Sequence, residues 1–116
     1  VGIAIAICVL AYSAGPFPLV ETHDAQEMQS AVQAGARLIG VNNRNLKDFT
    51  VDLGNAAKLR NGAPKGTVFV AESGVSSPED AAALRRTGAD AILVGEYLMR
   101  ASDKKQALNA LREVAK

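Results

Sequence analysis

Polar residues stand directly after four short apolar runs of the chain, where their side chains could do chemistry. These residues are Glu21, Asn42, Glu72 and the pair Gly95 and Glu96. If the runs are parallel strands, their carboxyl ends meet at one rim, which is where barrel enzymes place their catalytic groups. Two carboxylates and one amide around a common mouth suit acid–base work on a small polar substrate. Each glutamate alone is equally compatible with a solvated rim residue, and the repetition at every strand end favours a site.

The last two runs also end in the manner of an anion site. Gly74 closely follows the third run, and Gly95 directly follows the fourth. Each glycine is expected to lead into a helix, where free backbone N–H groups and the helix dipole attract anions. We therefore expect Gly74, Gly95 and the backbone N–H of Glu96 to hold a phosphate. The alternative is that the glycines only permit tight strand-to-helix turns.

The remaining candidate residues give weaker signals. His23 falls on the same side of its strand as Glu21, but it immediately precedes a helix cap, which favours a loop imidazole over an acid–base pair. Arg44 fits either an anion contact or a solvated loop side chain. One histidine and one cysteine without a ligand-spaced cluster disfavour a metal site. None of the six lysines ends a strand, so a barrel enzyme that needs a buried cationic acid must take it from elsewhere.

The pattern around these positions predicts strands that alternate with helices. The strands are expected at residues 19–21, 37–41, 68–71 and 91–94. Asp24 is the expected cap of the first helix, with Glu27 reaching back to it. Ser77, followed by Pro78, is a strong start for a later helix. Between them, Asp52 is expected to cap a weaker helix that ends at about residue 60.

Two further helices are expected after the last strand. A short one begins at Gly95, and a longer one begins near Ser102. The longer helix carries an apolar stripe formed by Ala107, Leu108, Leu111, Val114 and Ala115.

The predicted strands are continuous apolar runs, which are typical of a parallel sheet covered by helices. Residues 34–40 and 87–95 repeat the same order of helix stop, strand and glycine. The sequence therefore predicts an α/β fold, a parallel (β/α) barrel of TIM type. A complete barrel needs roughly 250 residues. The 116 residues are therefore interpreted as a half-barrel fragment of about four βα units, forming one domain over residues 1–116.

Composition limits the partners and the compartment. A net charge of +1 gives no reason to expect nucleic acid or a membrane surface as a partner. Val1–Tyr12 is almost wholly apolar, but it is shorter than the roughly 18 residues of a membrane helix, and its Val and Ile favour a buried strand. Cys8 in that run is expected to be a buried, inert thiol. Nothing indicates an oxidising compartment, so a cytoplasmic protein is expected.

Four motifs of the chain carry a family resemblance. They are Leu19-Val-Glu-Thr-His-Asp, Gly35-Ala-Arg-Leu-Ile-Gly-Val-Asn-Asn-Arg-Asn-Leu, Val70-Ala-Glu-Ser-Gly-Val and Leu93-Val-Gly-Glu-Tyr-Leu-Met-Arg. With their spacing, they closely resemble the C-terminal half of indole-3-glycerol-phosphate synthase, a barrel enzyme of tryptophan biosynthesis. The resemblance covers residues 18–112 and implies barrel strands five to eight. Residues 1–17 are atypical: residues 1–10 resemble a remnant of strand four, but residues 11–16 are too short for the helix that normally follows it.

The resemblance implies a lyase that closes, decarboxylates and dehydrates 1-(2-carboxyphenylamino)-1-deoxyribulose 5-phosphate without a cofactor. By resemblance, Glu21 assists proton transfer, Asn42 orients the substrate or a catalytic partner, and Glu72 stabilises the cationic iminium. The phosphate-binding backbone would be that of Ser73, Gly74, Gly95 and Glu96. The family's catalytic lysines and another glutamate belong to the first half of its barrel. The implied partners are therefore the phosphorylated substrate and either the missing N-terminal half-barrel or a second copy of the chain.

The sequence is compatible with three hypotheses for the function. The first is an indole-3-glycerol-phosphate synthase that is active only with its missing half. The second is a non-catalytic, phosphate-binding half-barrel that self-associates. The third is another phosphate-binding barrel, such as a thiamine-phosphate-synthase-like enzyme, against which the set of Glu21, Asn42 and Glu72 argues.

Overall fold

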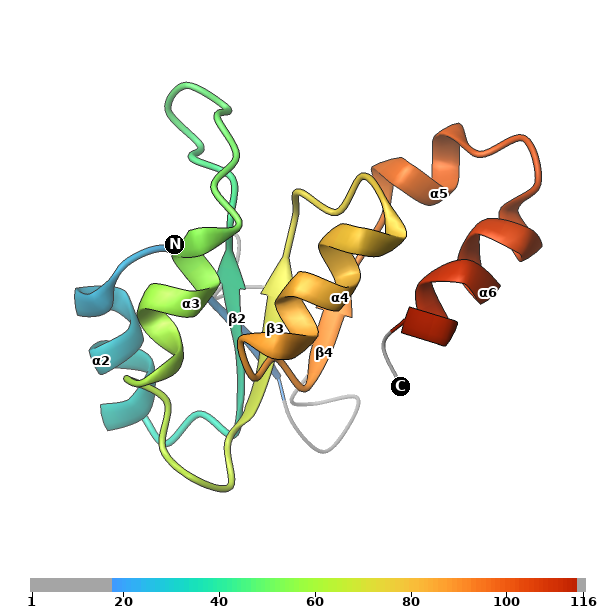
Figure 1. Ribbon diagram of the computed structural model, residues 1–116. Coiled ribbons are helices and arrows are strands. Elements are labelled where there is room, and N and C mark those ends of the chain that lie inside the picture. The colour runs from blue at the N-terminus through green and yellow to red at the C-terminus, as the bar shows by residue number, and fades with distance from the viewer. Residues whose placement is uncertain (1–17, 115–116) are drawn as a thin grey trace.

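The computed structural model describes residues 18–114, in which four strands alternate with helices (Figure 1). The strands are β1 (Leu19–Thr22), β2 (Leu38–Asn42), β3 (Val68–Glu72) and β4 (Ala91–Leu93). The helices are α2 (Ala25–Gln33), α3 (Gly54–Arg60), α4 (Pro78–Arg86), α5 (Glu96–Arg100) and α6 (Lys104–Val114).

The strands form one sheet in the order β1-β2-β3-β4, and every neighbouring pair is parallel. The register places Glu21 beside Gly40 and Asn42 beside Glu72. Glu72 is in turn beside Leu93 of β4. The predicted α/β fold with a parallel sheet is therefore confirmed, and its sequential strand order is that of part of a (β/α) barrel.

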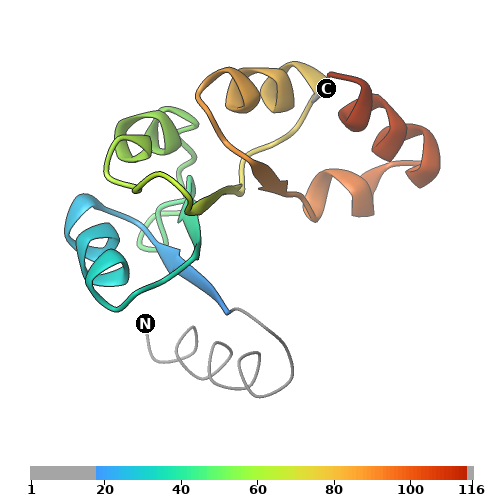
Figure 2. The same cartoon turned by 90° about the horizontal axis from the view of Figure 1, so that it is seen from below.

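The two faces of the sheet differ in what covers them. Helices α2, α3 and α4 lie on one face (Figure 2). Ile39, Val41, Phe69 and Ala71 are completely buried and share a core with residues of these helices, so they point to that face. The alternate residues of β2 and β3, including Gly40 and Glu72, point to the opposite face. We call this opposite face the inner face. None of the described helices covers the inner face in Figure 2.

The inner face combines the polar strand ends with exposed apolar side chains. Val68 at the start of β3 is 43% exposed, and Leu93 at the end of β4 is 56% exposed. Val68 shares the face of Glu72 because alternate residues of one strand point to the same side. Leu93 shares this face because it is the residue beside Glu72 on β4.

Two of the predicted helix starts are confirmed in detail. Asp24 Oδ1 accepts from the Glu27 N–H at 2.8 Å, and Glu27 Oε2 accepts from the His23 N–H at 2.7 Å, which completes a capping box. Ser77 caps α4 by accepting from the Asp80 N–H at 3.2 Å. These bonds satisfy backbone donors that the helices themselves leave unpaired.

The predictions for two other helices need correction. The residue that caps α3 is Leu53, and Asp52 instead accepts from the Gly54 N–H at 2.8 Å, closing a turn just before the helix. In α6 only part of the predicted stripe is buried, because Leu108 and Val114 are 44% and 38% exposed. The buried residues Ala107 and Leu111 suffice for the packing of α6 on α4.

The predicted strand limits differ from the observed limits by at most one residue. Strand β1 continues to Thr22, whose buried Oγ1 donates to the Gly40 carbonyl at 2.9 Å. Strands β2 and β3 include Asn42 and Glu72, because these two polar residues pair with each other in the parallel ladder. The strand expected in residues 1–12, Cys8 and Ala115 lie outside the described residues. No helix in residues 18–114 combines the length and apolar character needed to cross a lipid bilayer.

Candidate active site

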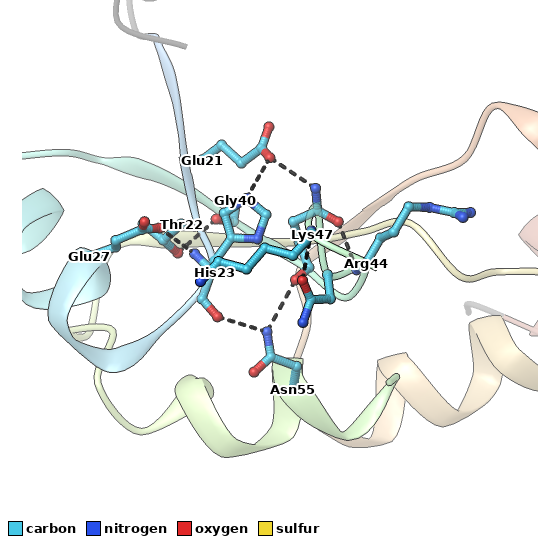
Figure 3. Close-up of polar contacts among 10 residues, drawn as sticks. Glu21, Thr22, His23, Glu27, Gly40, Arg44, Lys47 and Asn55 are labelled. Carbon is cyan, nitrogen blue, oxygen red and sulfur yellow. Dashed lines mark hydrogen bonds and ion pairs between the residues drawn. The ribbon is translucent and has the colours of Figure 1, made fainter. Parts of the chain in front are cut away.

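Three of the predicted site residues meet at the carboxyl end of the sheet. Asn42 Nδ2 donates to Glu21 Oε1 at 2.9 Å, which joins the ends of β1 and β2 (Figure 3). Glu72 is beside Asn42 in the register and therefore shares its face. The expectation that Glu21, Asn42 and Glu72 face a common mouth agrees with this arrangement.

Glu72 is buried without a full set of hydrogen-bond partners. Its side chain is only 3% exposed, and its Oε1 has no hydrogen-bond partner in the described part of the chain. Burial, together with the nearby Glu21 carboxylate, raises the pKa of Glu72 to about 7. A carboxyl group with a pKa near neutrality can both give and take a proton at physiological pH.

His23 makes a contact that the sequence interpretation did not favour. It lies in the bend just before α2, as expected of a loop residue, but its Nε2 is 3.3 Å from Glu21 Oε1. Its backbone is fixed on both sides, because its N–H donates to Glu27 and its carbonyl accepts from Asn55 Nδ2 at 3.0 Å (Figure 3). The rigid backbone directs the imidazole toward Glu21.

Two asparagines that the sequence interpretation missed hold the strand ends together. Asn55, in the first turn of α3, donates from Nδ2 to the carbonyls of His23 and Asn42, at 3.0 and 3.1 Å. Asn43 is 3% exposed, accepts from the Ala56 N–H at 3.1 Å, and donates to the Ser73 carbonyl at 3.3 Å. The one signal in the sequence was the position of Asn43 directly after a buried strand.

The predicted phosphate residues line a single open cleft. Its volume is about 950 Å³, and Ser73, Gly74, Gly95 and Glu96 all border it, together with two arginines, Arg44 and Arg100. Ser73 and Gly74 both have left-handed backbone conformations, with φ of 67° and 89°. A left-handed serine is uncommon and often marks a functional turn.

The Glu96 side chain links the two arginines of the cleft. Arg44 Nη2 donates to Glu96 Oε2 at 3.3 Å, and Arg100 Nη2 lies 2.8 Å from Glu96 Oε1. Arg44 is therefore neither a freely solvated side chain nor an isolated cation. The carboxylate offsets positive charge that would otherwise face an anion in the cleft.

The two glycines differ in how the chain continues after them. Gly95 directly precedes α5, as expected, and is its N-cap residue. Because glycine has no side chain, it cannot accept a hydrogen bond from the first N–H groups of that helix. After Gly74 the chain continues through Ser76 and reaches α4 at Pro78, which is the predicted helix start. Ser77 caps α4 and separates the helix from Gly74, so only Gly95 directly precedes a helix.

The described residues can also be searched for a metal-binding group and for a lysine on a strand. In residues 18–114 no group of three or more His, Cys, Asp or Glu side chains is placed to hold a metal ion. The lysines of the same residues all lie in turns or helices, and none lies on a strand. The inner face of the described sheet therefore carries carboxyl and amide groups but no lysine.

Comparison with solved structures reveals a shared fold. Thiamine phosphate pyrophosphorylase from Pyrococcus furiosus aligns with a TM-score of 0.73 at 24% identity, over 91% of this chain and 52% of that one. The (S)-3-O-geranylgeranylglyceryl phosphate synthase from Thermoplasma acidophilum aligns with a TM-score of 0.65 at 23% identity, over 79% of this chain and 36% of that one. At such identities the likeness concerns the fold alone.

Comparison at the sequence level is more specific. The indole-3-glycerol phosphate synthase of Ruminiclostridium cellulolyticum is 52% identical over 94 residues, which are 81% of this chain and 36% of that enzyme. The synthase of Leuconostoc mesenteroides is 48% identical over 103 residues, which are 89% of this chain and 39% of that enzyme. This chain thus spans less than half the length of these relatives. Because the sequence profile of indole-3-glycerol phosphate synthase also matches residues 5–111, the chain belongs to the indole-3-glycerol phosphate synthase family.

Proposed function

We propose that this chain provides the C-terminal part of the catalytic barrel of an indole-3-glycerol phosphate synthase. The reaction would be ring closure, decarboxylation and dehydration of 1-(2-carboxyphenylamino)-1-deoxyribulose 5-phosphate in tryptophan biosynthesis, which makes the enzyme a carboxy-lyase. The observation that carries the proposal is the pair of carboxyl groups at the strand ends, Glu21 and the buried Glu72, beside the amide of Asn42.

The two carboxyl groups would have different tasks. Burial raises the pKa of Glu72 to about 7, so this carboxyl group can lose its proton near neutral pH. The resulting carboxylate would face the reacting carbon and stabilise the positive charge of the iminium. Glu21 would move protons in the closing and dehydrating steps. Asn42, which already donates to Glu21, would orient that carboxylate or the substrate.

The cleft would hold the phosphate of the substrate. The backbone of Ser73 and Gly74 borders it, as does the start of α5 at Gly95 and Glu96, where no side chain caps the helix. Backbone N–H groups at such positions are suited to anions.

The synthase would be completed by the barrel segment that the relatives carry outside the matched region. The inner face of residues 18–114 offers carboxyl and amide groups but no lysine, and a general acid contributes about 10²–10⁴ in rate. We therefore expect no measurable turnover from the isolated 116-residue chain. The missing cation would come from the other segment of the barrel.

A chimera tests this proposal. The chain replaces the matching segment of the Ruminiclostridium cellulolyticum synthase, and turnover is measured with the parent enzyme as the reference. An active chimera that loses at least about 100-fold in turnover on Glu72→Gln or Glu21→Gln supports the proposal. A folded chimera without activity, or one that tolerates both substitutions, contradicts it.

A second candidate function is a phosphate-binding half-barrel without catalysis. The exposed apolar residues Val68 and Leu93 on the inner face favour it, because a second copy would cover them. In that case the chimera would be inactive, whereas the isolated chain would still bind phosphate and would associate with itself.

A further inference from the structure

Strand β2 has a glycine at the point where the Glu72 side chain crosses it. A Cβ atom placed on Gly40 would overlap Glu72 Oε1 and would lie 2.7 Å from Glu72 Cδ and 3.3 Å from Oε2. Real Cβ atoms do not come this close to a carboxyl group. The Glu72 carboxyl group therefore occupies the volume that any other residue at position 40 would fill.

The register explains where the Glu72 carboxyl is directed. Glu72 begins beside Asn42 on β2, whereas its carboxyl group lies over Gly40, two residues back along that strand. Gly40 is the β2 residue beside Glu21 on β1. The side chain thus crosses β2 toward β1, where the Glu21 carboxyl group is the charge that acts on it.

We propose that Gly40 is a positioning residue for Glu72. Its missing side chain provides the space in which the Glu72 carboxyl group extends across β2 toward Glu21. The importance of this arrangement for turnover rests on the proposed function, but its effect on Glu72 does not.

The groups around the Glu72 carboxyl group favour its protonated form. Strand β1 contributes Glu21, with His23 3.3 Å from it, and β2 contributes only the neutral amide of Asn42. Strand β4 contributes Leu93, which is apolar. Glu72 Oε1 is buried and has no partner among the described residues, so a proton on this carboxyl group removes the cost of two adjacent charges.

Gly40 could instead be a glycine that only fits the packing of the sheet. The Thr22 hydroxyl donates to its carbonyl, so the backbone is held in place whatever residue stands there. Under this alternative, a methyl group at position 40 would lower stability by the same amount whether residue 72 has a long or a short side chain. Under our proposal the length of residue 72 decides the effect.

The first experiment follows the side-chain carboxyl signal of Glu72 by ¹³C NMR as the pH is raised, without substrate, in the 116-residue chain at a concentration at which light scattering shows a monomer. In the wild type we expect a pKa of about 7. In Gly40→Ala the carboxyl group is displaced toward the open inner face and away from Glu21. Its pKa should fall by at least about one pH unit toward the ordinary glutamate value of 4.5.

The matched control is Ala91→Val. Ala91 is exposed and lies on the inner face at the same level as Gly40, because both residues are beside Val70 in the register. It adds volume to the inner face without meeting Glu72 and should leave the Glu72 titration where it is in the wild type. An unchanged Glu72 titration in Gly40→Ala overturns the proposal, as does an equal shift in Ala91→Val.

The second experiment covers the case in which Gly40→Ala folds poorly. Glu72→Asp shortens the side chain by one methylene, which leaves room for a Cβ at position 40. Gly40→Ala should then reduce the urea midpoint by at most about half as much in the Glu72→Asp background as in the wild type. Equal losses in the two backgrounds, or a failure to fold in both, overturn the proposal.

Discussion

At the scale of single residues, the ionisation of Glu72 has the largest consequence. Its pKa is raised from 4.5 to about 7, first by burial and then by Glu21. Between these two pH values the folded chain holds a proton that the unfolded chain has already lost. Stability must therefore decrease as the pH rises through this interval and then level off.

We predict that the free energy of unfolding falls by up to about 3 kcal/mol between pH 4.5 and pH 7. Urea unfolding at several pH values measures it. Glu72→Gln should remove the slope, whereas the exposed Glu113→Gln should leave it in place. Asp48 and Asp80, whose pKa values are lowered from 3.8 by hydrogen bonds to Thr50 and Ser76, act only below this interval. A slope that persists in Glu72→Gln would assign the proton to another group.

Asn55 is predicted to stabilise the site from outside it. Its Nδ2 donates to the carbonyls at the ends of two strands, so Asn55→Ala leaves both without that donor. At about 0.5–1.5 kcal/mol for each bond, we expect a loss of about 2 kcal/mol in unfolding free energy. Asn109→Ala, at an exposed position of α6, is the matched control and should change stability by less than about 0.5 kcal/mol. Equal losses of unfolding free energy in both variants would show that the two hydrogen bonds of Asn55 do not stabilise the fold.

The site residues differ in how far the sequence reveals them. Glu21, Asn42 and Glu72 can be predicted because strand ends of a parallel sheet meet at one edge, so a one-dimensional pattern implies proximity. The contacts of Asn55 cannot be predicted, since its partners are main-chain carbonyls 13 and 32 residues away. Such bonds depend on how α3 packs beside two strand ends, which composition and periodicity do not encode.

At the scale of elements, the turn from β4 into α5 carries the clearest test of the anion site. A side chain at Gly95 would meet open space, so Gly95→Val should fold, and its bulk would stand in the cleft. We predict that it weakens binding of inorganic phosphate by about 1–3 kcal/mol, the cost of donors left unpaired. Amide shifts during a phosphate titration measure the affinity. If the wild type has no phosphate-induced shifts near Gly74 and Gly95, the site does not exist in this chain.

Gly74 is the less suitable position for the same test. A Cβ there would overlap the Val51 side chain and would lie 2.9 Å from Leu53 Cδ2. Gly74→Val would therefore disturb the segment before α3 as well as any bound anion. The difference between the two glycines comes from the loop between β2 and α3, in which Arg44 and Val51 form an antiparallel bridge. No local pattern of the sequence indicates that this loop folds back over the end of β3.

The Glu96 side chain is predicted to oppose anion binding in the cleft. Its carboxylate pairs with both Arg44 and Arg100, which lowers the positive charge available to a phosphate. Glu96→Gln should therefore strengthen phosphate binding by a few-fold, or about 0.3–1 kcal/mol, since these ion pairs are largely exposed. Raising the salt concentration should reduce the gain. Weaker binding in Glu96→Gln would mean that the carboxylate organises the cleft rather than neutralising it.

At the scale of the whole molecule, the fold was more predictable than its surface. Continuous apolar strands and strong caps at Asp24 and Ser77 predicted the order of elements, because each signal is local. The apolar stripe of α6 was predicted too wide, since periodicity does not tell which part of a stripe finds a neighbour. Leu108 and Val114 remain partly exposed because α6 buries only Ala107 and Leu111 in its packing against α4.

The inner face leads to a prediction about association. Val68 and Leu93 are exposed there, and β1 and β4 are the edges of the described sheet. Exposed strand edges and apolar faces tend to pair with another chain unless they are covered. We therefore predict that the chain associates with itself at tens of micromolar, roughly the concentration at which exposed hydrophobic surface causes association.

Light scattering with two lysine variants tests where the association takes place. Leu93→Lys puts a charge on the inner face and should shift the chain toward monomer, because burying an unpaired ammonium is costly. Leu108→Lys changes an apolar residue of similar exposure on α6, 44% against 56%, and should leave association unchanged. Association lost in both variants would indicate a general hydrophobic effect. A monomeric wild type would show that the inner face does not mediate association.

Addition of the complementary barrel segment should compete with self-association, because both partners would cover the same face that carries Glu21 and Glu72.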